Sequence, residues 1–475
     1  MDVDVNCLPG KLICKIFSEL PPLMLVDVIP LVCKRWYGLS KRQESWRNCD
    51  IVISDTASKK ELDQLVRLAS GAPYLNYVDF TKVNDLGPEV KAIVSALLKV
   101  PKTVRSLCAF GSSTVAMREL TRKMLKAWAS TLREVTIPLP RPATISKDYR
   151  VSMCTILTRI SEIRKLQKLC FILHGVPDFD YTGQLSKGFS SLKKFSVLSE
   201  DYGCLSSIKC NRFIFDILEN NKKQLVEVNI TEVCHPIDKF KVALASCHNL
   251  VSCKVPLEIL SVVKNMSQLQ SLEVYFMPLD ELKIAKSWRE LRHFIGTSSV
   301  IEEITELFLT EPPLHRNPCK IRPYYIDVCL AVLARKIKRV KNFRLLNVKW
   351  MSDLNLKLFF SNLINANSIC VIDSLDASPF SKCHIEMLSA SKYLKLLKIV
   401  NLKVPSVCVA EEIQESIQNL KSQQPLLQTD FNIIVVDQSA SLKTINNTAP
   451  SLNYYNCYHD EEDFIIYGLL MRIFS

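Results

Sequence analysis

One short pattern of apolar residues recurs along most of this chain and constrains its fold more than any other feature. An apolar residue is followed three positions later by a second one, and two positions after that by a third. The thirteen starts of this pattern are Leu75, Val104, Leu132, Leu166, Leu192, Leu225, Leu250, Leu269, Ile304, Val340, Ile369, Leu394 and Phe431. Successive starts lie 19 to 37 residues apart, which is room for one strand and one helix. The pattern therefore predicts an array of stacked repeats rather than a single compact core.

Helix-like segments fill several of these intervals, for example 90–100, 208–220, 325–338 and 355–365. This alternation resembles the leucine-rich-repeat solenoid, an α/β fold with parallel strands on its concave face and helices on its convex face. The asparagine or cysteine that this family carries eight positions after each start is absent, because Val83, His174, Glu258 and Leu402 stand there. We therefore expect an irregular solenoid. The alternative is a doubly wound α/β domain, against which the uneven spacing and the 11 glycines argue.

Side chains alternate between the two faces of a strand, so the residues between the apolar ones point to the concave face. Several of these outward residues are basic or aromatic, as is typical of a recognition surface. The candidate substrate-binding residues are Tyr77, Lys168, Lys194, Lys254, Tyr275, Phe308, Arg344 and Lys398.

The first fifty residues follow a different pattern, that of three short helices. The first helix carries an apolar stripe made of Leu12, Ile13, Ile16, Phe17 and Leu20. Pro21 and Pro22 end this helix, since proline lacks the backbone donor. A second apolar run at 23–28 precedes Pro30, and a third amphipathic helix is predicted over 31–46. Helices this short cannot bury all their apolar groups among themselves, so we expect a partner to cover part of this surface.

Five short motifs in this region resemble the F-box: Leu8-Pro9, Ile16-Phe17, Leu20-Pro21, residues 31–36 (LVCKRW) and Trp46-Arg47. The stretch between Pro21 and Cys33 departs from the family pattern, because it is one residue longer and has Met24 where aspartate is common. The resemblance implies docking on the Skp adaptor, which in turn joins the cullin scaffold and the RING subunit. It assigns the adaptor interface to Leu8, Pro9, Ile13, Ile16, Phe17, Leu20, Val32 and Trp36.

The chain is thus expected to hold an F-box at 1–50, a connecting helix or linker at 51–70, and a leucine-rich-repeat solenoid at 71–449. The last segment, 450–475, ends in an acidic run and the apolar sequence FIIYGLLMRIF. Solenoids need their last apolar turn covered, so this segment is interpreted as a cap, with a partner-binding tail as the alternative.

Motifs of catalysis and metal binding are missing from the sequence. It contains no GxGxxG, no GxxxxGK[ST] and no GxSxG, and none of its 18 cysteines forms a CxxC pair. Three Cys-His pairs occur, at 234/235, 247/248 and 383/384. Adjacent residues on a strand face opposite sides, so we expect neither a metal site nor any cofactor.

The net charge of +13 lies almost wholly outside the first fifty residues, which contribute only +1. This charge is interpreted as that of a solvated, soluble surface, and the alternative is attraction to acidic or phosphorylated partners. The basic segment 335–344 contains a single aromatic residue, Phe343, and is interpreted as the favourable end of a helix rather than a nucleic-acid site.

These observations predict a non-catalytic substrate-recognition subunit of an SCF-type (Skp-cullin-F-box) ubiquitin ligase, with no membrane contact. The alternatives are an Skp-binding scaffold without ligase activity and a basic nucleic-acid-binding repeat protein. With no signal sequence and no apolar stretch of about 20 residues, we expect the protein in the cytoplasm or the nucleus.

Overall fold

The structure is a computed structural model, and it describes residues 7–100, 102–110, 114–139, 147–173, 189–199, 208–230, 237–275, 292–310, 324–346, 352–372, 381–404, 406–436 and 442–446. The chain divides into two compact units. Unit 1 comprises Met1–Leu225 with Cys234–Pro236, and unit 2 comprises Val226–Val233 with Ile237–Ser475. No described helix is long and apolar enough to cross a membrane.

Unit 1 begins with a group of short helices. They are α1 (Gly10–Ser18), α2 (Pro22–Asp27), α3 (Ile29–Val32), α4 (Lys34–Ser40) and the 3-10 helix η2 (Gln43–Trp46). The third helix predicted over 31–46 is therefore wrong as a continuous element. Cys33 has extended backbone, and its Sγ accepts a hydrogen bond from the amide of Trp36 at 3.4 Å, which starts α4 anew. Pro30 lies in the first turn of α3, where its missing amide costs no helical hydrogen bond.

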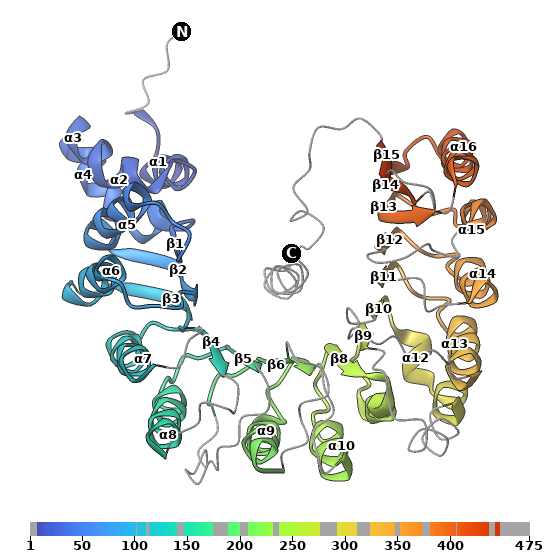
Figure 1. The fold of residues 1–475 in the computed structure, drawn as a ribbon, viewed down its shortest axis with the longest axis horizontal. Coiled ribbons are helices and arrows are strands. Elements are labelled where there is room, and N and C mark those ends of the chain that lie inside the picture. Colours follow the sequence, from blue (N-terminus) through green and yellow to red (C-terminus); the bar gives the residue numbers. More distant parts are fainter. Residues whose placement is uncertain are drawn as a thin grey trace. The chain divides into compact units, whose positions relative to one another are not determined.

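The rest of unit 1 alternates strands with helices. The strands are β1 (Asp50–Ser54), β2 (Tyr74–Lys82), β3 (Thr103–Cys108), β4 (Glu134–Leu139), β5 (Lys168–Leu173) and β6 (Lys194–Ser199). The helices are α5 (Lys59–Gly71), α6 (Pro88–Lys99), α7 (Val115–Trp128), α8 (Lys147–Ser161) and α9 (Ile208–Asn221). Each strand pairs in parallel with the next, and the described helices cover one face of the sheet (Figure 1).

Local sequence explains where several of these helices begin. Ser58 and Glu61 form a capping box at the start of α5, in which the Glu61 carboxylate accepts the Ser58 amide at 2.7 Å. Thr114 accepts the amide of Met117 at the start of α7. Pro88 stands in the first turn of α6, where proline is preorganised for a helix.

Unit 2 repeats the same alternation. Its strands are β7 (Glu227–Ile230), β8 (Ser252–Pro256), β9 (Ser271–Tyr275), β10 (Glu306–Thr310), β11 (Asn342–Leu346), β12 (Ser368–Ile372), β13 (Leu396–Val404), β14 (Gln428–Val436) and β15 (Leu442–Asn446). Its helices are α10 (Ile237–Ala245), η4 (Leu257–Asn265), α12 (Ser299–Glu303), α13 (Tyr324–Lys336), α14 (Asp353–Asn362), α15 (Lys382–Met387), η6 (Leu388–Ala390) and α16 (Val407–Gln423). Strands β7 to β14 run parallel, whereas β15 is antiparallel to β14. The expected cap at 450–475 lies outside the described residues.

The strand registers confirm the recurring apolar pattern for eleven of its thirteen predicted copies. In unit 1, Val78 pairs with Leu107, Leu107 with Val135, and Val135 with Leu169. In unit 2, the pairing continues from Cys253 to Leu272, Leu307 and Phe343. These side chains are at most 2% exposed and pack between the sheet and the helices. The protein is thus a mixed α/β fold of amino-terminal helices followed by parallel strands and helices, consistent with a leucine-rich-repeat-like solenoid.

Two predicted starts are wrong in register. Phe343 pairs with Ile369, so the apolar triplet of β12 is Ala366, Ile369 and Val371, and it begins three residues before the predicted start. The run at 369–372 is apolar throughout, and a small alanine at the true start concealed its periodicity.

In β14, the register pairs Leu397 with Thr429 and Ile399 with Phe431. The predicted start, Phe431, therefore occupies the last position of its triplet. A threonine at the middle position broke the pattern.

The segment 51–70, expected to be a connecting helix or linker, contains most of β1 and α5. Ile51 pairs with Val78, and both side chains are fully buried. The sheet of unit 1 therefore begins at Asp50, the last residue of the expected F-box, and continues into the segment that was expected to be a connecting helix or linker.

Candidate adaptor and substrate surfaces

The amino-terminal helices enclose a small core of their own. Its largest members are Ile13, Phe17 and Trp46, all at most 2% exposed. Phe17 meets the ring of Trp36 edge to face, with centroids 5.2 Å apart. The indole of Trp46 donates to the carbonyl of Ser40 at 2.5 Å. Ile13 and Phe17, two of the residues assigned to the adaptor interface, thus lie inside this core and shape the surface from beneath.

A concentration of exposed apolar side chains lies on the outside of the same helices. Seven of the seventeen exposed large apolar residues in the described part of the chain fall within residues 12–37. They are Leu12 (49% exposed), Ile16 (46%), Met24 (37%), Val28 (46%), Leu31 (83%), Val32 (54%) and Tyr37 (53%), and we call them the apolar docking face. Helices α1 to α4 carry this face and pack against one another. A concentration of this kind marks an interaction site.

The docking face overlaps only in part with the residues assigned from the sequence. Ile16 and Val32 belong to it, Pro9 is exposed beside it in sequence, and Leu8, Leu20 and Trp36 are partly exposed. The Arg35 guanidinium donates to the Leu8 carbonyl at 2.5 Å and so holds the entry of the chain against α4.

Five members of the docking face are not among the residues assigned to the adaptor interface from the sequence, and Leu31 is the most exposed of them. A sequence signal existed on α1. Its stripe contains two i, i+4 pairs about 100° apart on the helix, and only Ile13 with Phe17 is buried, while Leu12 with Ile16 is exposed.

Helix α5 joins these helices to the first strands. An ideal Cβ at Gly71 would lie 2.7 Å from Cγ1 of Val26, so only glycine allows α5 to approach α2 this closely. Arg67 of α5 also pairs with Asp27 of α2 at 2.5 Å. The docking face and the start of the sheet therefore belong to one packed body.

The outward strand face of unit 1 carries three of the predicted substrate-binding residues. Tyr77 donates to Asp79 at 3.0 Å and lies 3.1 Å from the Cys108 thiol. Burial raises the pKa of both groups, that of Cys108 to about 12, so both stay neutral. Lys168 and Lys194 pair in register on adjacent strands, and Lys168 lies 4.0 Å from Glu134. Two lysines at neighbouring positions raise the local positive potential of this face.

The outward face of unit 2 brings four more candidates into one row across the strands. The row runs in register through Lys254, Glu273, Phe308, Arg344, Cys370, Lys398 and Asp430. Lys254 pairs with Glu273 at 3.4 Å, and Lys398 pairs with Asp430 at 2.9 Å. The Arg344 guanidinium lies 4.8 Å from the centroid of the Phe308 ring.

The acidic residues Glu273 and Asp430 in this row were not among the candidates predicted from the sequence, which are all basic or aromatic. The row is therefore charge-paired rather than uniformly basic. Tyr275, the remaining candidate, is 5% exposed and lies two residues beyond Glu273 on β9.

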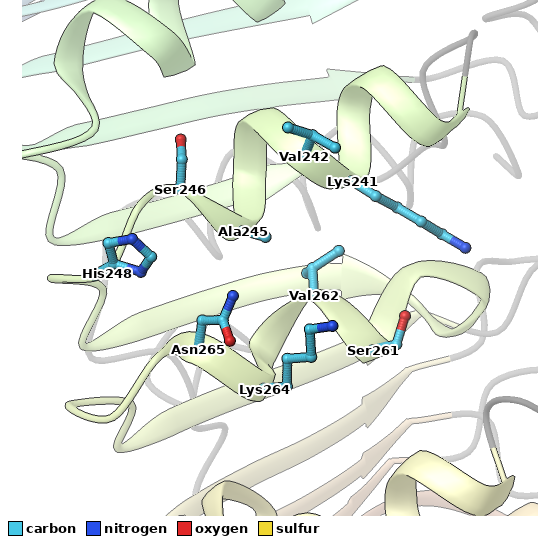
Figure 2. A pocket seen from close by; sticks show the side chains of 9 residues that line it. All are labelled: Lys241, Val242, Ala245, Ser246, His248, Ser261, Val262, Lys264 and Asn265. Atoms are coloured by element: carbon cyan, nitrogen blue, oxygen red, sulfur yellow. The ribbon is translucent and has the colours of Figure 1, made fainter.

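A shallow groove of about 440 Å³ opens between α10 and η4 on the helical side of unit 2 (Figure 2). Lys241 stands at one end and His248 at the other, with the apolar Val242, Ala245 and Val262 between them. The nine lining residues include no carboxylate. The groove offers a basic, apolar surface for contact but no arrangement for acid-base catalysis.

Two of the six basic residues in the segment 335–344 pair with acidic residues of α12, in the preceding repeat. Lys336 pairs with Glu302 at 2.5 Å, and Arg339 pairs with Glu303. The thirteen cysteines whose side chains the structure describes are free thiols. In the described residues, a group able to hold a metal ion occurs where Asp353, Cys383 and His384 meet.

Comparison with known protein families identifies only the amino-terminal region. Residues 5–52 match the family described as F-box-like, which is about a tenth of the chain. No curated protein matches the chain. The match spans α1 to η2 and the first residues of β1, so it contains the whole apolar docking face. Residues 5–52 are therefore an F-box-like domain, and this domain supports a role as an Skp-binding adaptor.

Proposed function

We propose that this protein is the substrate-recognition subunit of an SCF-type ubiquitin ligase. The F-box-like domain binds the Skp adaptor, and through it the cullin and RING subunits. The outward strand faces bind a protein substrate. The chain itself is non-catalytic, because ubiquitin transfer belongs to the other subunits. It works in the cytoplasm or the nucleus.

The observation that carries this proposal is the apolar docking face within the matched region. Leu31 and Val32 on α3 are 83% and 54% exposed, while Ile13 and Phe17 on α1 of the same domain are buried. A folded domain that exposes large apolar groups while its own core is filled has the anatomy of a protein-binding surface. Helices α1 to α4 hold these side chains in place before binding, so little conformational entropy is lost when the adaptor docks.

The outward strand faces support the substrate role. Lys168 and Lys194 lie side by side in register, and Arg344 stacks on Phe308. Basic and aromatic groups together favour an acidic or phosphorylated segment. Tethering such a substrate to the ligase raises its effective concentration at the site of ubiquitin transfer.

Co-purification from cells tests the docking step. The substitutions Leu31→Asp and Val32→Asp, introduced together, bring two carboxylates onto the docking face. We expect Skp recovery to be lost while the melting temperature of the chain stays near that of the unmodified protein. The matched control is Val115→Asp with Leu354→Asp, since these side chains are 65% and 67% exposed and lie outside the F-box-like domain. Skp recovery that survives the first pair would refute the proposal.

The same experiment separates the alternatives. Recovery of both Skp and cullin supports a ligase subunit, whereas Skp without cullin indicates a scaffold. Retention of RNA or DNA that salt releases, with neither protein recovered, indicates a nucleic-acid-binding protein.

Substrate binding needs a separate test on the outward face. Proximity labelling with and without proteasome inhibition identifies proteins that accumulate near the chain. We expect Lys168→Glu with Lys194→Glu to reduce that set, and Lys123→Glu on the exposed side of α7 to leave it unchanged. An identical set from all three proteins would place the substrate elsewhere.

A further inference from the structure

Four lysines and three apolar side chains lie on one edge of unit 2. They occupy the turns that lead from a helix to the next strand, with Lys421 in the last turn of α16. Because β11 to β14 run parallel, their four turns lie at the same edge of the sheet, where the strands begin. We call these residues the basic edge: Lys341, Lys392, Lys395, Lys421, Ile364, Tyr393 and Leu426.

Hydrogen bonds hold these turns against one another. The amide of Asn367 donates to the carbonyl of Lys341 at 2.6 Å, and the amide of Lys395 donates to the carbonyl of Asn367 at 2.8 Å. The Gln424 side chain donates from Nε2 to the carbonyl of Ser391 at 3.0 Å. The basic edge is therefore one surface rather than four separate loops.

The side chains of the basic edge are open to a partner. Leu426 is 90% exposed, Tyr393 60% and Ile364 42%. All four lysines are exposed, and within the described part of the chain none of them pairs with a carboxylate. No aspartate or glutamate occurs in the four turns, which are 337–341, 363–367, 391–395 and 424–427. Unpaired lysines beside exposed apolar groups favour a partner that is both acidic and apolar.

The same chain contains a segment of this composition. Its acidic run, Asp460 to Asp463, is followed directly by the apolar run 464–474, FIIYGLLMRIF. The acidic run offers four carboxylates to the four lysines. The apolar run offers a cover for the exposed Leu426 and Tyr393. Both components of the basic edge therefore have a counterpart in segment 460–474.

The chain also runs toward the basic edge where its described part ends. Strand β15 is antiparallel to β14, with Val436 opposite Leu442 and Asn432 opposite Asn446. At Asn446 the chain is therefore heading for the edge at which β14 begins. Residues 447–459 can span at most about 43 Å. The strands from β11 to β15 cover four spacings, or about 19 Å, so the acidic run can reach all four turns.

We propose that segment 460–474 docks on the basic edge of unit 2 in the same chain. Its carboxylates pair with the lysines, and its apolar run covers Leu426, Tyr393 and Ile364. One contact thereby neutralises unpaired charge and removes exposed apolar surface. The contact does not depend on the proposed ligase role, because it involves neither the apolar docking face nor the outward strand faces.

Hydrogen–deuterium exchange of the full chain tests this contact by charge reversal. In the unmodified protein, we expect the amides of 460–474 to exchange more slowly than those of a free peptide of the same sequence. Lys392→Glu with Lys395→Glu should speed this exchange roughly 10-fold, because ion pairs are lost and like charges meet. Glu461→Lys with Glu462→Lys should have the same effect. The four substitutions together should restore slow exchange.

Matched controls separate this contact from a general effect of charge or exposed area. Lys241→Glu with Lys264→Glu makes the same charge change at the groove between α10 and η4, and it should leave the exchange of 460–474 unchanged. Leu426→Ser should speed that exchange. Leu354→Ser should not, since Leu354 is 67% exposed at the start of α14, on the edge where the strands end. Protection should also be independent of protein concentration.

Three results would overturn the proposal. One is exchange of 460–474 at the rate of the free peptide in the unmodified chain. Another is unchanged protection in the Lys392→Glu, Lys395→Glu variant, which would place the segment elsewhere. The third is protection that is lost on dilution, which would assign the contact to a second copy of the chain.

Discussion

Replacing Leu31 and Val32 with alanine should weaken adaptor binding without weakening the fold. Burying a large aliphatic side chain contributes about 2 kcal/mol. Scaled by the exposed fractions of 83% and 54%, the two side chains offer about 2.7 kcal/mol to a partner that covers them. Alanine keeps part of this area, so we expect a loss of about 2 kcal/mol, or roughly 30-fold in Kd.

The same substitutions should change the free energy of unfolding by less than about 0.5 kcal/mol each, because neither side chain contributes to the core. Titration calorimetry against purified Skp adaptor measures the Kd, and denaturant unfolding measures the stability. Val115→Ala with Leu354→Ala is the control, since it removes a similar exposed area elsewhere. A change in Kd of less than about threefold would show that α3 lies outside the interface and refute the reasoning.

Three further predictions follow from the packing. Gly71→Ala should lower the free energy of unfolding, measured with denaturant, by about 1–3 kcal/mol, because the new Cβ would meet Val26. Gly38→Ala is the control and should be neutral or stabilising, because open space surrounds Gly38. Equal effects of the two substitutions would contradict the close approach of α5 to α2. Phe17→Ala should lower the free energy of unfolding by about 3–5 kcal/mol and unfold the helices that carry the docking face, so it should lose Skp binding and lower the melting temperature together. Loss of binding at unchanged stability would instead indicate that Phe17 contacts Skp directly. Burial raises the pKa of Cys108 from 9.0 to about 12, so the stability gained by burying its neutral thiol is complete below pH 9 and is lost as pH rises through 12. The unfolding midpoint should therefore fall less steeply with pH in Cys108→Ala than in the unmodified protein. Equal slopes of midpoint against pH would refute the role of this thiol.

The sequence predicted the strands well wherever the apolar pattern was unbroken. Leucine, isoleucine, valine and phenylalanine at fixed spacing report burial directly, because they occupy the side of each strand that faces the helices. The pattern failed at Ala366, a small residue at a buried position, and at Thr429, a partly buried polar residue at the middle position of its strand. Only pairing with the neighbouring strand fixes the register there.

The surfaces were harder to predict because their composition depends on contacts between repeats. Lys168 meets Glu134, and Lys398 meets Asp430, across more than thirty residues of sequence. No local pattern reveals such pairs. The docking face shows the same limit, since a helical stripe gives the apolar residues but not which of them the neighbouring helices cover.

The position of β1 affects how this protein is best manipulated in cells. Asp50–Ser54 lies partly inside the F-box-like match, yet it is also the strand that pairs with β2. Deleting residues 1–50 or 1–52 would remove part of this strand together with the buried Trp46 and Cys49. It would expose the edge of β2, which invites aggregation. Such a truncation would confuse loss of docking with loss of folding, so surface substitutions on α3 are the better way to uncouple this protein from its adaptor.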